Sequence, residues 1–162
     1  VPSGTLATLR GQTISTQVLT ADPKKVVWKG PVSILVDGTT SGAAEVLASA
    51  IEANHRGDVV GERTFGLASE QKLIPIEDGS ALILTVGNYY NADGKSILEE
   101  GVAPTEVVQA MNDDSEDDDD TAASADQRKH EKAEPQPLSA DDPVFQKAVE
   151  LLKASAPAKK AA

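Results

Sequence analysis

The stretch that decides the fold is GPVSILVDGTTSGAAEVLASAIEANHRGDVVG, which occupies residues 30–61. It opens with Pro31–Val36, a run rich in β-branched residues that ends at Asp37-Gly38 and so predicts a strand followed by a turn. Asp58–Gly61 predicts a second short strand. A helical pattern separates the two, so the stretch has the order and length of a βαβ crossover between parallel strands.

The helix between these strands is expected to begin near Ala43. Gly57 is expected to cap its end, because glycine commonly takes the left-handed conformation there. Apolar residues at helical spacing predict the face that packs on the sheet. That face consists of Ala43, Val46, Leu47, Ala50, Ile51 and Asn54.

Further strands are expected on both sides of this unit. Thr5–Leu9 and Val26–Trp28 have strand composition. Gln71–Ile76 and Ala81–Gly87 flank a short Gly-containing turn and predict a β-hairpin. The predicted fold class is therefore α/β, with a mixed sheet that contains a βαβ crossover and a β-hairpin, plus a C-terminal amphipathic helix.

The chain changes character after about residue 110. Asp113–Asp120 contains seven acidic residues out of eight, and Thr121–Pro137 has almost no large apolar side chain, which is typical of a disordered linker. Asp142-Pro143 then predicts the start of an amphipathic helix. The predicted organisation is a core at residues 1–110, an acidic disordered linker at 111–140, a helix packing on the core at 141–155 and a frayed tail at 156–162.

A calcium site is the alternative interpretation of the acidic run. An EF-hand loop needs spaced oxygen ligands and a central glycine. No glycine follows Asp113, so we expect a solvated linker.

Composition narrows the possible functions. The 162 residues suit one domain, and 15 Lys and Arg against 26 Asp and Glu give a net charge of −11, which disfavours nucleic acid and anionic membrane surfaces as partners. The absence of cysteine excludes disulfides, thiolate zinc sites and a cysteine nucleophile, and two histidines argue against a His-rich metal site. We expect no metal or cofactor. No apolar run approaches the roughly 20 residues of a membrane-spanning helix. Because Val1 is not a natural start, we expect a piece of a longer protein.

Aromatic residues make up only 3% of the chain. Trp28 and Phe65 are therefore expected to anchor a small core.

The loop at residues 37–45 is the candidate site, because open α/β sheets place ligands where a strand ends and a helix begins. The Ala43 backbone N–H at the helix start could stabilise an oxyanion. The structural alternative is that Thr39, Thr40 or Ser41 merely caps the helix.

Several motifs around this loop occur in a recognisable order. Gly30–Asp37, Thr40–Glu45 and Val59–Gly66 resemble, in sequence and spacing, the C-terminal processing peptidases, also called tail-specific proteases. The similarity continues through Gln71, Asp78–Ser80, Leu84–Val86, Tyr90–Ile97, Gly101–Pro104 and the helix after Asp142. In all it covers about Val1 to Val108 and Asp142 to Lys153.

The resemblance implies a serine peptidase that acts on the C-terminal segments of proteins or peptides. It also implies a Ser-Lys catalytic pair, a supporting Gln, a separate upstream PDZ domain and residence in the bacterial periplasm or cell envelope. In the family pattern the nucleophile lies three residues before a Glu, which Glu45 matches, so Gly42 occupies its position. The lysine base follows Phe-Gly, and Leu67 stands there, whereas Gln71 keeps the family residue.

These two replacements predict a catalytically degenerate domain. Glycine has no oxygen to attack a carbonyl, and leucine cannot accept a proton. The alternative is an active peptidase that uses Ser41 or a residue from the missing upstream part. Its possible bases are poorly placed, because Lys72 should face away from Gln71 on a strand and His55 lies at the far end of the helix.

Overall fold

The computed structural model describes residues 1–109 and 140–155, and the predicted linker and frayed tail lie outside these ranges except at the margins. The chain contains seven strands, two α-helices and one short 3-10 helix among the described residues. In chain order they are β1 (Thr5–Arg10), β2 (Gln17–Thr20), η1 (Pro23–Lys25), β3 (Ser33–Val36), α1 (Ala43–Ala53), β4 (Asp58–Gly61), β5 (Ser69–Pro75), β6 (Ala81–Tyr90), β7 (Glu106–Val107) and α2 (Pro143–Ser155).

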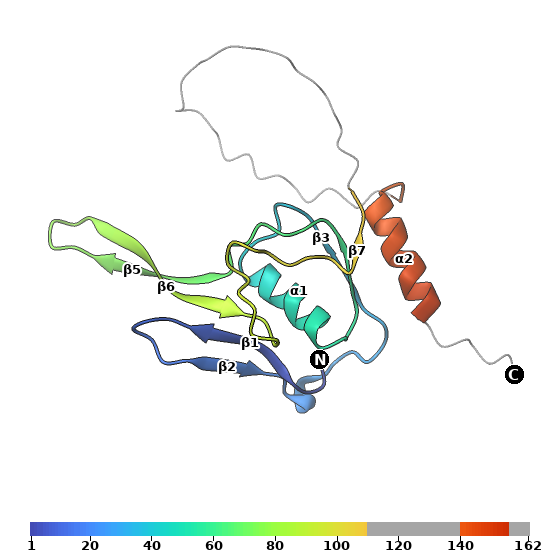
Figure 1. The fold of residues 1–162 in the computed structure, drawn as a ribbon, viewed down its shortest axis with the longest axis horizontal. Coiled ribbons are helices and arrows are strands. Elements are labelled where there is room, and N and C mark those ends of the chain that lie inside the picture. Colours follow the sequence, from blue (N-terminus) through green and yellow to red (C-terminus); the bar gives the residue numbers. More distant parts are fainter. Residues whose placement is uncertain (110–139, 156–162) are drawn as a thin grey trace, which may run out of the picture.

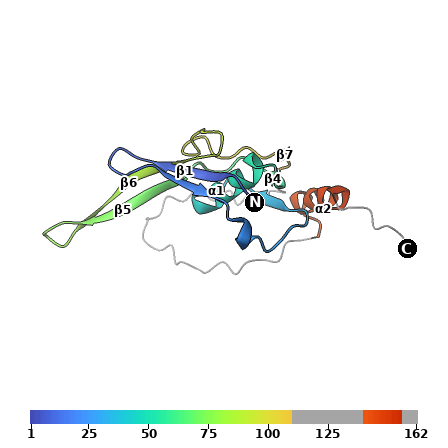
Figure 2. The same ribbon diagram turned by 90° about the horizontal axis from the view of Figure 1, so that it is seen from below.

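The strands form two sheets around α1 (Figure 1). One is a four-stranded antiparallel sheet in the order β2-β1-β6-β5, and the other is a three-stranded parallel sheet in the order β3-β4-β7. The α/β class is confirmed, but the strands divide between two sheets where a single mixed sheet was expected. Seen from below, the β5–β6 hairpin and α2 lie at opposite ends of an elongated body (Figure 2).

The predicted βαβ crossover is present. β3 and β4 pair in parallel from Ser33↔Asp58 to Val36↔Gly61, and α1 connects them. Gly61 has φ 129°, and a Cβ there would overlap the Val36 carbonyl oxygen, so the two strands can approach only because this residue is glycine. The loop from β3 to α1 therefore begins at a point where the end of β3 is held against β4.

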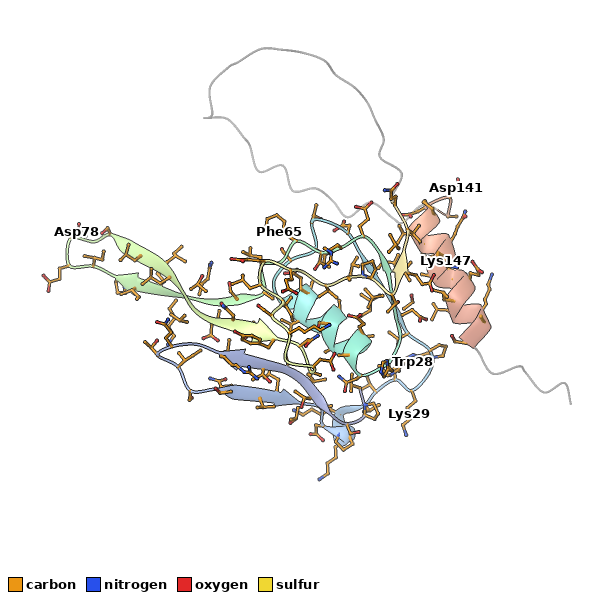
Figure 3. The ribbon with its side chains drawn as sticks, viewed as in Figure 1. Trp28, Lys29, Phe65, Asp78, Asp141 and Lys147 are labelled. Carbon is orange, nitrogen blue, oxygen red and sulfur yellow. The ribbon has the colours of Figure 1, made fainter. Side chains whose placement is uncertain are left out.

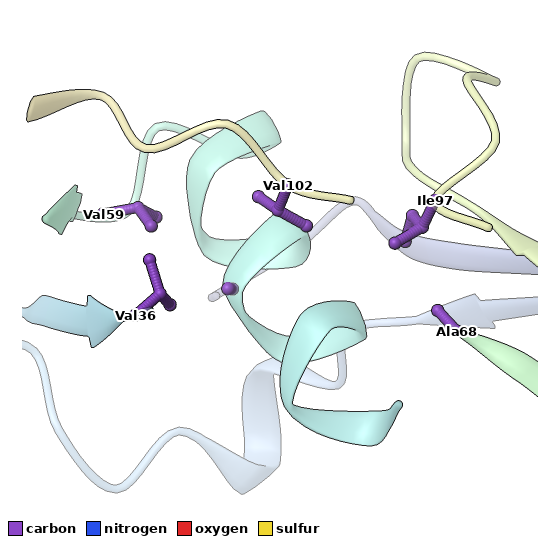
Figure 4. Close-up of a cluster of buried hydrophobic side chains, with 6 residues drawn as sticks. Val36, Val59, Ala68, Ile97 and Val102 are labelled. Atoms are coloured by element: carbon purple, nitrogen blue, oxygen red, sulfur yellow. The ribbon is translucent and has the colours of Figure 1, made fainter. Parts of the chain in front are cut away.

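A small apolar core joins the two sheets through α1. Its buried members come from six different parts of the chain and are gathered around α1 (Figure 4). They are Val36, Ala48, Val59, Ala68, Ile97 and Val102. A second cluster, in which Val144 and Ala148 of α2 pack on Val60 of β4, holds α2 against the parallel sheet. Neither α1 nor α2, the two α-helices among the described residues, is long and apolar enough to cross a membrane.

The predicted face of α1 is only partly correct. The buried residues are Glu45, Ala48, Ser49, Ala50 and Ile51, whereas Leu47 is 58% exposed. Because α1 lies between two sheets, small residues such as Ala48 and Ala50 allow the close approach, and Leu47 is left on the open side of the helix. The expected cap is also wrong, since His55 with φ 49° takes the left-handed position and Arg56 N–H closes the turn on the Ile51 carbonyl at 2.9 Å.

Two strand predictions need correction. Val26–Trp28 is a loop, because no neighbouring strand reaches it and Val27 is 99% exposed. β2 and β7 were missed, because both are short and gain their structure from pairing with β1 and β4. The two aromatic anchors were wrong as well, since Trp28 and Phe65 are 61% and 63% exposed.

Candidate functional site

The loop after β3 is folded by Asp37. Its Oδ1 accepts hydrogen bonds from the backbone N–H and hydroxyl groups of Thr39 and Thr40, at 2.8–2.9 Å. Partial burial raises the pKa of Asp37, but these hydrogen bonds lower it more, so it lies below its ordinary value. The threonines therefore close a turn on Asp37 and do not cap α1, which corrects the structural alternative for them.

Gly42 is the residue that precedes α1. Its φ of 64° and ψ of −124° belong to a region that residues with a Cβ rarely adopt. Space is available there, because a Cβ built at Gly42 would meet no atom within 4 Å. The sharp strand-to-helix turn at this position thus depends on backbone conformation and not on the lack of room for a side chain.

Glu45, in the first turn of α1, is fully buried and holds the site together. One carboxylate oxygen accepts the Gly42 N–H at 2.9 Å and the Leu67 N–H at 2.8 Å. The other accepts the Thr64 hydroxyl and the Gly66 N–H, both at 2.6 Å. We call Glu45 and these four donors the carboxylate clamp.

The carboxylate clamp brings together the two positions that the family resemblance singles out. Because the Gly42 and Leu67 N–H groups donate to the same Glu45 oxygen, their two nitrogens are separated by no more than the sum of the two N···O hydrogen-bond distances. The Phe65 N–H also donates to the Thr40 carbonyl at 2.9 Å and adds a direct link between the two loops. The positions matched to nucleophile and base are therefore neighbours, although neither carries a reactive side chain.

Ser41 and Ala43 border this junction. Ser41 is exposed, and its hydroxyl makes no hydrogen bond with any described residue. Ala43 is the first residue of α1, and within the described part of the chain its N–H has no acceptor. This N–H stands at the positive end of the helix dipole, where the oxyanion donor was expected.

The other predicted residues lie farther away along their elements. Gln71 is exposed on β5 opposite Thr85, and neighbouring side chains such as Lys72 alternate between the faces of the strand. His55 follows the other end of α1 from Ser41, so the helix separates the two. No described Lys or His side chain donates to the Thr40–Gly42 loop or to Thr64–Leu67.

The structure also contains a separate open cavity of about 730 Å³ at the C-terminal end of α1. Glu52, His55, Arg56 and Lys95 contribute to its lining. Burial raises the pKa of Glu52, the charge of Asp93 adds to this, and Lys95 and His55 oppose it. This cavity is distinct from the Gly42 turn. Across residues 1–109 and 140–155, no group of three His, Cys, Asp or Glu side chains is arranged to hold a metal ion.

The sequence profile of peptidase family S41 matches residues 1–108. The chain belongs to this family. This S41 domain is 35% identical over 79 residues to the carboxy-terminal-processing protease of Bartonella bacilliformis, covering 49% of this chain and 18% of the relative. It is 37% identical over 87 residues to the chloroplastic C-terminal processing peptidase of Tetradesmus obliquus, covering 54% of this chain and 19% of that protein.

Among solved structures, the S41 domain is similar to a photosystem II D1 C-terminal processing protease. The TM-score is 0.61 at 32% identity, over 67% of this chain and 28% of the other. The chain thus spans about a fifth of the length of these sequence relatives, whose names describe processing of carboxyl termini.

The feature that sequence reasoning missed is the burial of Glu45. The signal available was the position of this Glu at the third helical residue, from which a carboxylate can reach back to the N-cap N–H. Its bonds to Thr64, Gly66 and Leu67 had no local signal.

Proposed function

We propose that this S41 domain is catalytically degenerate and binds the C-terminal segments of proteins without cleaving them. The observation that carries the proposal is the junction of Gly42 and Leu67 on one oxygen of Glu45. The two backbones lie next to each other as a nucleophile and its base would have to. The side chains needed for acyl transfer are absent at both positions.

Glu45 does not replace the missing base. Its two oxygens already accept four hydrogen bonds, and the side chain is fully buried. A general base must reach the proton that it removes within hydrogen-bonding distance. The Glu45 carboxylate is therefore a structural acceptor in this site.

What remains at the surface suits binding of an extended chain. Phe65 and Leu67 are 63% and 46% exposed beside the Gly42 turn, and β5, which begins at Ser69, is an outer strand. An extended peptide could add to that edge by β-augmentation, with apolar side chains on Phe65 and Leu67.

The hairpin register indicates which backbone groups are available for this pairing. Ile76 N–H donates to the Ser80 carbonyl at 2.8 Å. Alternation along an antiparallel pair then directs the backbone groups of Lys72 and Ile74 toward β6 and those of Gln71 and Leu73 outward. Gln71, the matched family residue, is thus part of the proposed peptide-binding edge.

The proposal extends to the rest of the parent protein. Relatives named as carboxyl-terminal-processing proteases suggest protein C-termini as the bound class, and the family resemblance suggests an upstream PDZ domain that presents them. We place the parent protein in the bacterial periplasm or cell envelope on the same basis.

Covalent labelling of the parent protein with a serine-reactive fluorophosphonate tests the loss of catalysis. Peptide-level mass spectrometry is expected to find no modification at Ser41 in folded protein, and Ser41→Ala is the control. Labelling at Ser41 that disappears in this variant would overturn the proposal in favour of an active peptidase.

A gain-of-function experiment complements the labelling. The double variant Gly42→Ser with Leu67→Lys should acquire fluorophosphonate reactivity and peptidase activity, because it restores a nucleophile beside a base. Gly42→Ser with Leu67→Met is the matched control, since it lacks only the amine. Equal reactivity of the two variants would contradict the assignment of residue 67 as the base position.

A further inference from the structure

Residues 23–29, Pro-Lys-Lys-Val-Val-Trp-Lys, form a surface segment whose charge opposes that of the whole chain. We call it the basic loop. It contains three lysines and no acidic residue, whereas the chain has a net charge of −11. It begins with η1 and continues as irregular chain to the residue before Gly30.

The basic loop displays apolar side chains between its lysines. Val27 is 99% exposed and Trp28 is 61% exposed. Lys24, Lys25 and Lys29 are exposed as well. Figure 3 shows Trp28 and Lys29 at the edge of the body, with Lys29 directed away from it.

Several hydrogen bonds hold the basic loop in this conformation. Arg56, just after α1, donates from Nη2 to the carbonyls of Trp28 at 3.1 Å and Gly30 at 2.8 Å. The Trp28 indole N–H donates to the Pro31 carbonyl at 3.1 Å, and the ring lies so close to Gly30 that a Cβ there would overlap it. Because its N–H is already bonded, Trp28 presents only apolar ring surface outward.

We propose that the basic loop docks the protein on an anionic lipid bilayer, with Val27 and Trp28 entering the interface and the lysines contacting the headgroups. Tryptophan favours this region of a bilayer, and each lysine near an anionic surface strengthens the attraction. Asp22 adjoins the loop, where its Oδ1 accepts the Lys24 N–H at 2.9 Å, and its charge offsets that of one lysine. More distant negative charges do not prevent this docking, because salt screens charges over about 8 Å at physiological ionic strength.

An acidic protein partner is the less favoured occupant because of the size of the apolar surface. A stable protein interface buries about 800 Å² on each side. Val26 is half-buried, and the other residues of the loop besides Val27 and Trp28 are one proline and three lysines. Only Val27 and Trp28 therefore offer exposed apolar side chains. A bilayer can bury these two side chains without an extended complementary surface.

The single tryptophan makes the test direct, because all tryptophan fluorescence comes from Trp28. The full chain is titrated at an ionic strength of about 0.15 M with phosphatidylcholine vesicles that contain or lack phosphatidylglycerol. We expect a blue shift of the emission and co-sedimentation only with the anionic vesicles. Raising the salt should reverse both, as screening weakens the lysine contacts.

Variants distinguish a lipid contact made by the basic loop from non-specific adsorption to vesicles. Val27→Asp should lower vesicle partitioning at least tenfold, because it replaces an exposed apolar side chain with a negative charge, the same sign as the vesicle surface. Each of Lys24→Gln, Lys25→Gln and Lys29→Gln should lower it about fivefold. Val107→Asp, a change at another valine that is 77% exposed, is the matched control and should partition like the unmodified chain.

The possible outcomes decide the proposal. Unchanged Trp28 emission with anionic vesicles overturns it, as does an equal loss of binding in Val27→Asp and Val107→Asp. A blue shift with polyglutamate that exceeds the shift with vesicles overturns the lipid assignment in favour of an acidic polypeptide. Salt-sensitive binding that Val27→Asp abolishes supports it.

Discussion

Replacing Glu45 with glutamine tests the role of the carboxylate clamp most directly. Glutamine has nearly the same shape as glutamate, but one of its two terminal groups is a donor. Each Glu45 oxygen accepts two hydrogen bonds, so the new NH₂ group must face two donors whichever way the amide is turned. The Thr64 hydroxyl can rotate, whereas the N–H groups of Gly42, Gly66 and Leu67 cannot become acceptors.

The magnitude follows from the number of donors left without a partner. In the better orientation the amide NH₂ faces Thr64 and Gly66, and at least the Gly66 N–H loses its acceptor. A buried donor without a partner costs about 1–3 kcal/mol, and hydrogen bonds to a charged acceptor are worth about 1.5–3 kcal/mol. We therefore expect Glu45→Gln to lower the free energy of unfolding by about 3 kcal/mol, a large part of the roughly 5–15 kcal/mol typical of a domain.

Urea unfolding of the full chain, followed by far-UV circular dichroism, measures this loss. Hydrogen exchange at Gly42, Gly66 and Leu67 shows whether the loss is centred on the clamp. Glu77→Gln, at an exposed turn position, is the matched control and should leave the midpoint unchanged. If Glu45→Gln changes the unfolding free energy by no more than the control does, the reasoning about the carboxylate clamp is refuted.

Three further predictions concern the same region. Thr64→Val should lower the unfolding free energy by about 2 kcal/mol, because it removes a hydroxyl that is bonded at both ends, whereas Thr64→Ser should recover most of this loss in the same urea assay. Gly42→Ala should lower the unfolding free energy by about 1–3 kcal/mol, because a residue with a Cβ is strained at φ 64° even where there is space for it. Gly38→Ala is the control and should be nearly neutral, because position 38 has equal space and no positive φ. Similar urea midpoints for the two variants would contradict a strained turn at Gly42. Because the pKa of Asp37 is lowered in the folded state, its stabilising effect is present above the unfolded pKa of about 3.9 and is lost as the pH falls through the folded pKa. The urea midpoints of the unmodified chain and of Asp37→Asn should therefore differ above about pH 4 and converge below it.

Local patterns in the sequence were sufficient for most of the elements. Strand composition and helical spacing over residues 30–61 predicted β3, α1 and β4, and their order predicted a parallel crossover. The Gly-containing turn between β5 and β6 predicted their pairing. These predictions succeeded because each depends on residues close together in the chain.

Only the tertiary structure decided which side chains are buried. Leu47 and Trp28 are exposed, although apolar character favoured burial, and Glu45 is fully buried, although its charge favoured exposure. The motif spacing of the family was readable in the sequence, and it marked Gly42 and Leu67 as a pair.

The physical reason is that the hydrogen-bond donors to the Glu45 carboxylate come mostly from a distant part of the chain. Glu45 is stable in the interior because its acceptors are matched by donors 19 to 22 residues away, beyond β4. A pattern within one helix contains no information about such groups, since burial depends on what the rest of the chain brings to that face. The sequence by itself therefore determined most of the elements and the positions matched to the family pattern, while tertiary contacts decided how a buried carboxylate joins those positions.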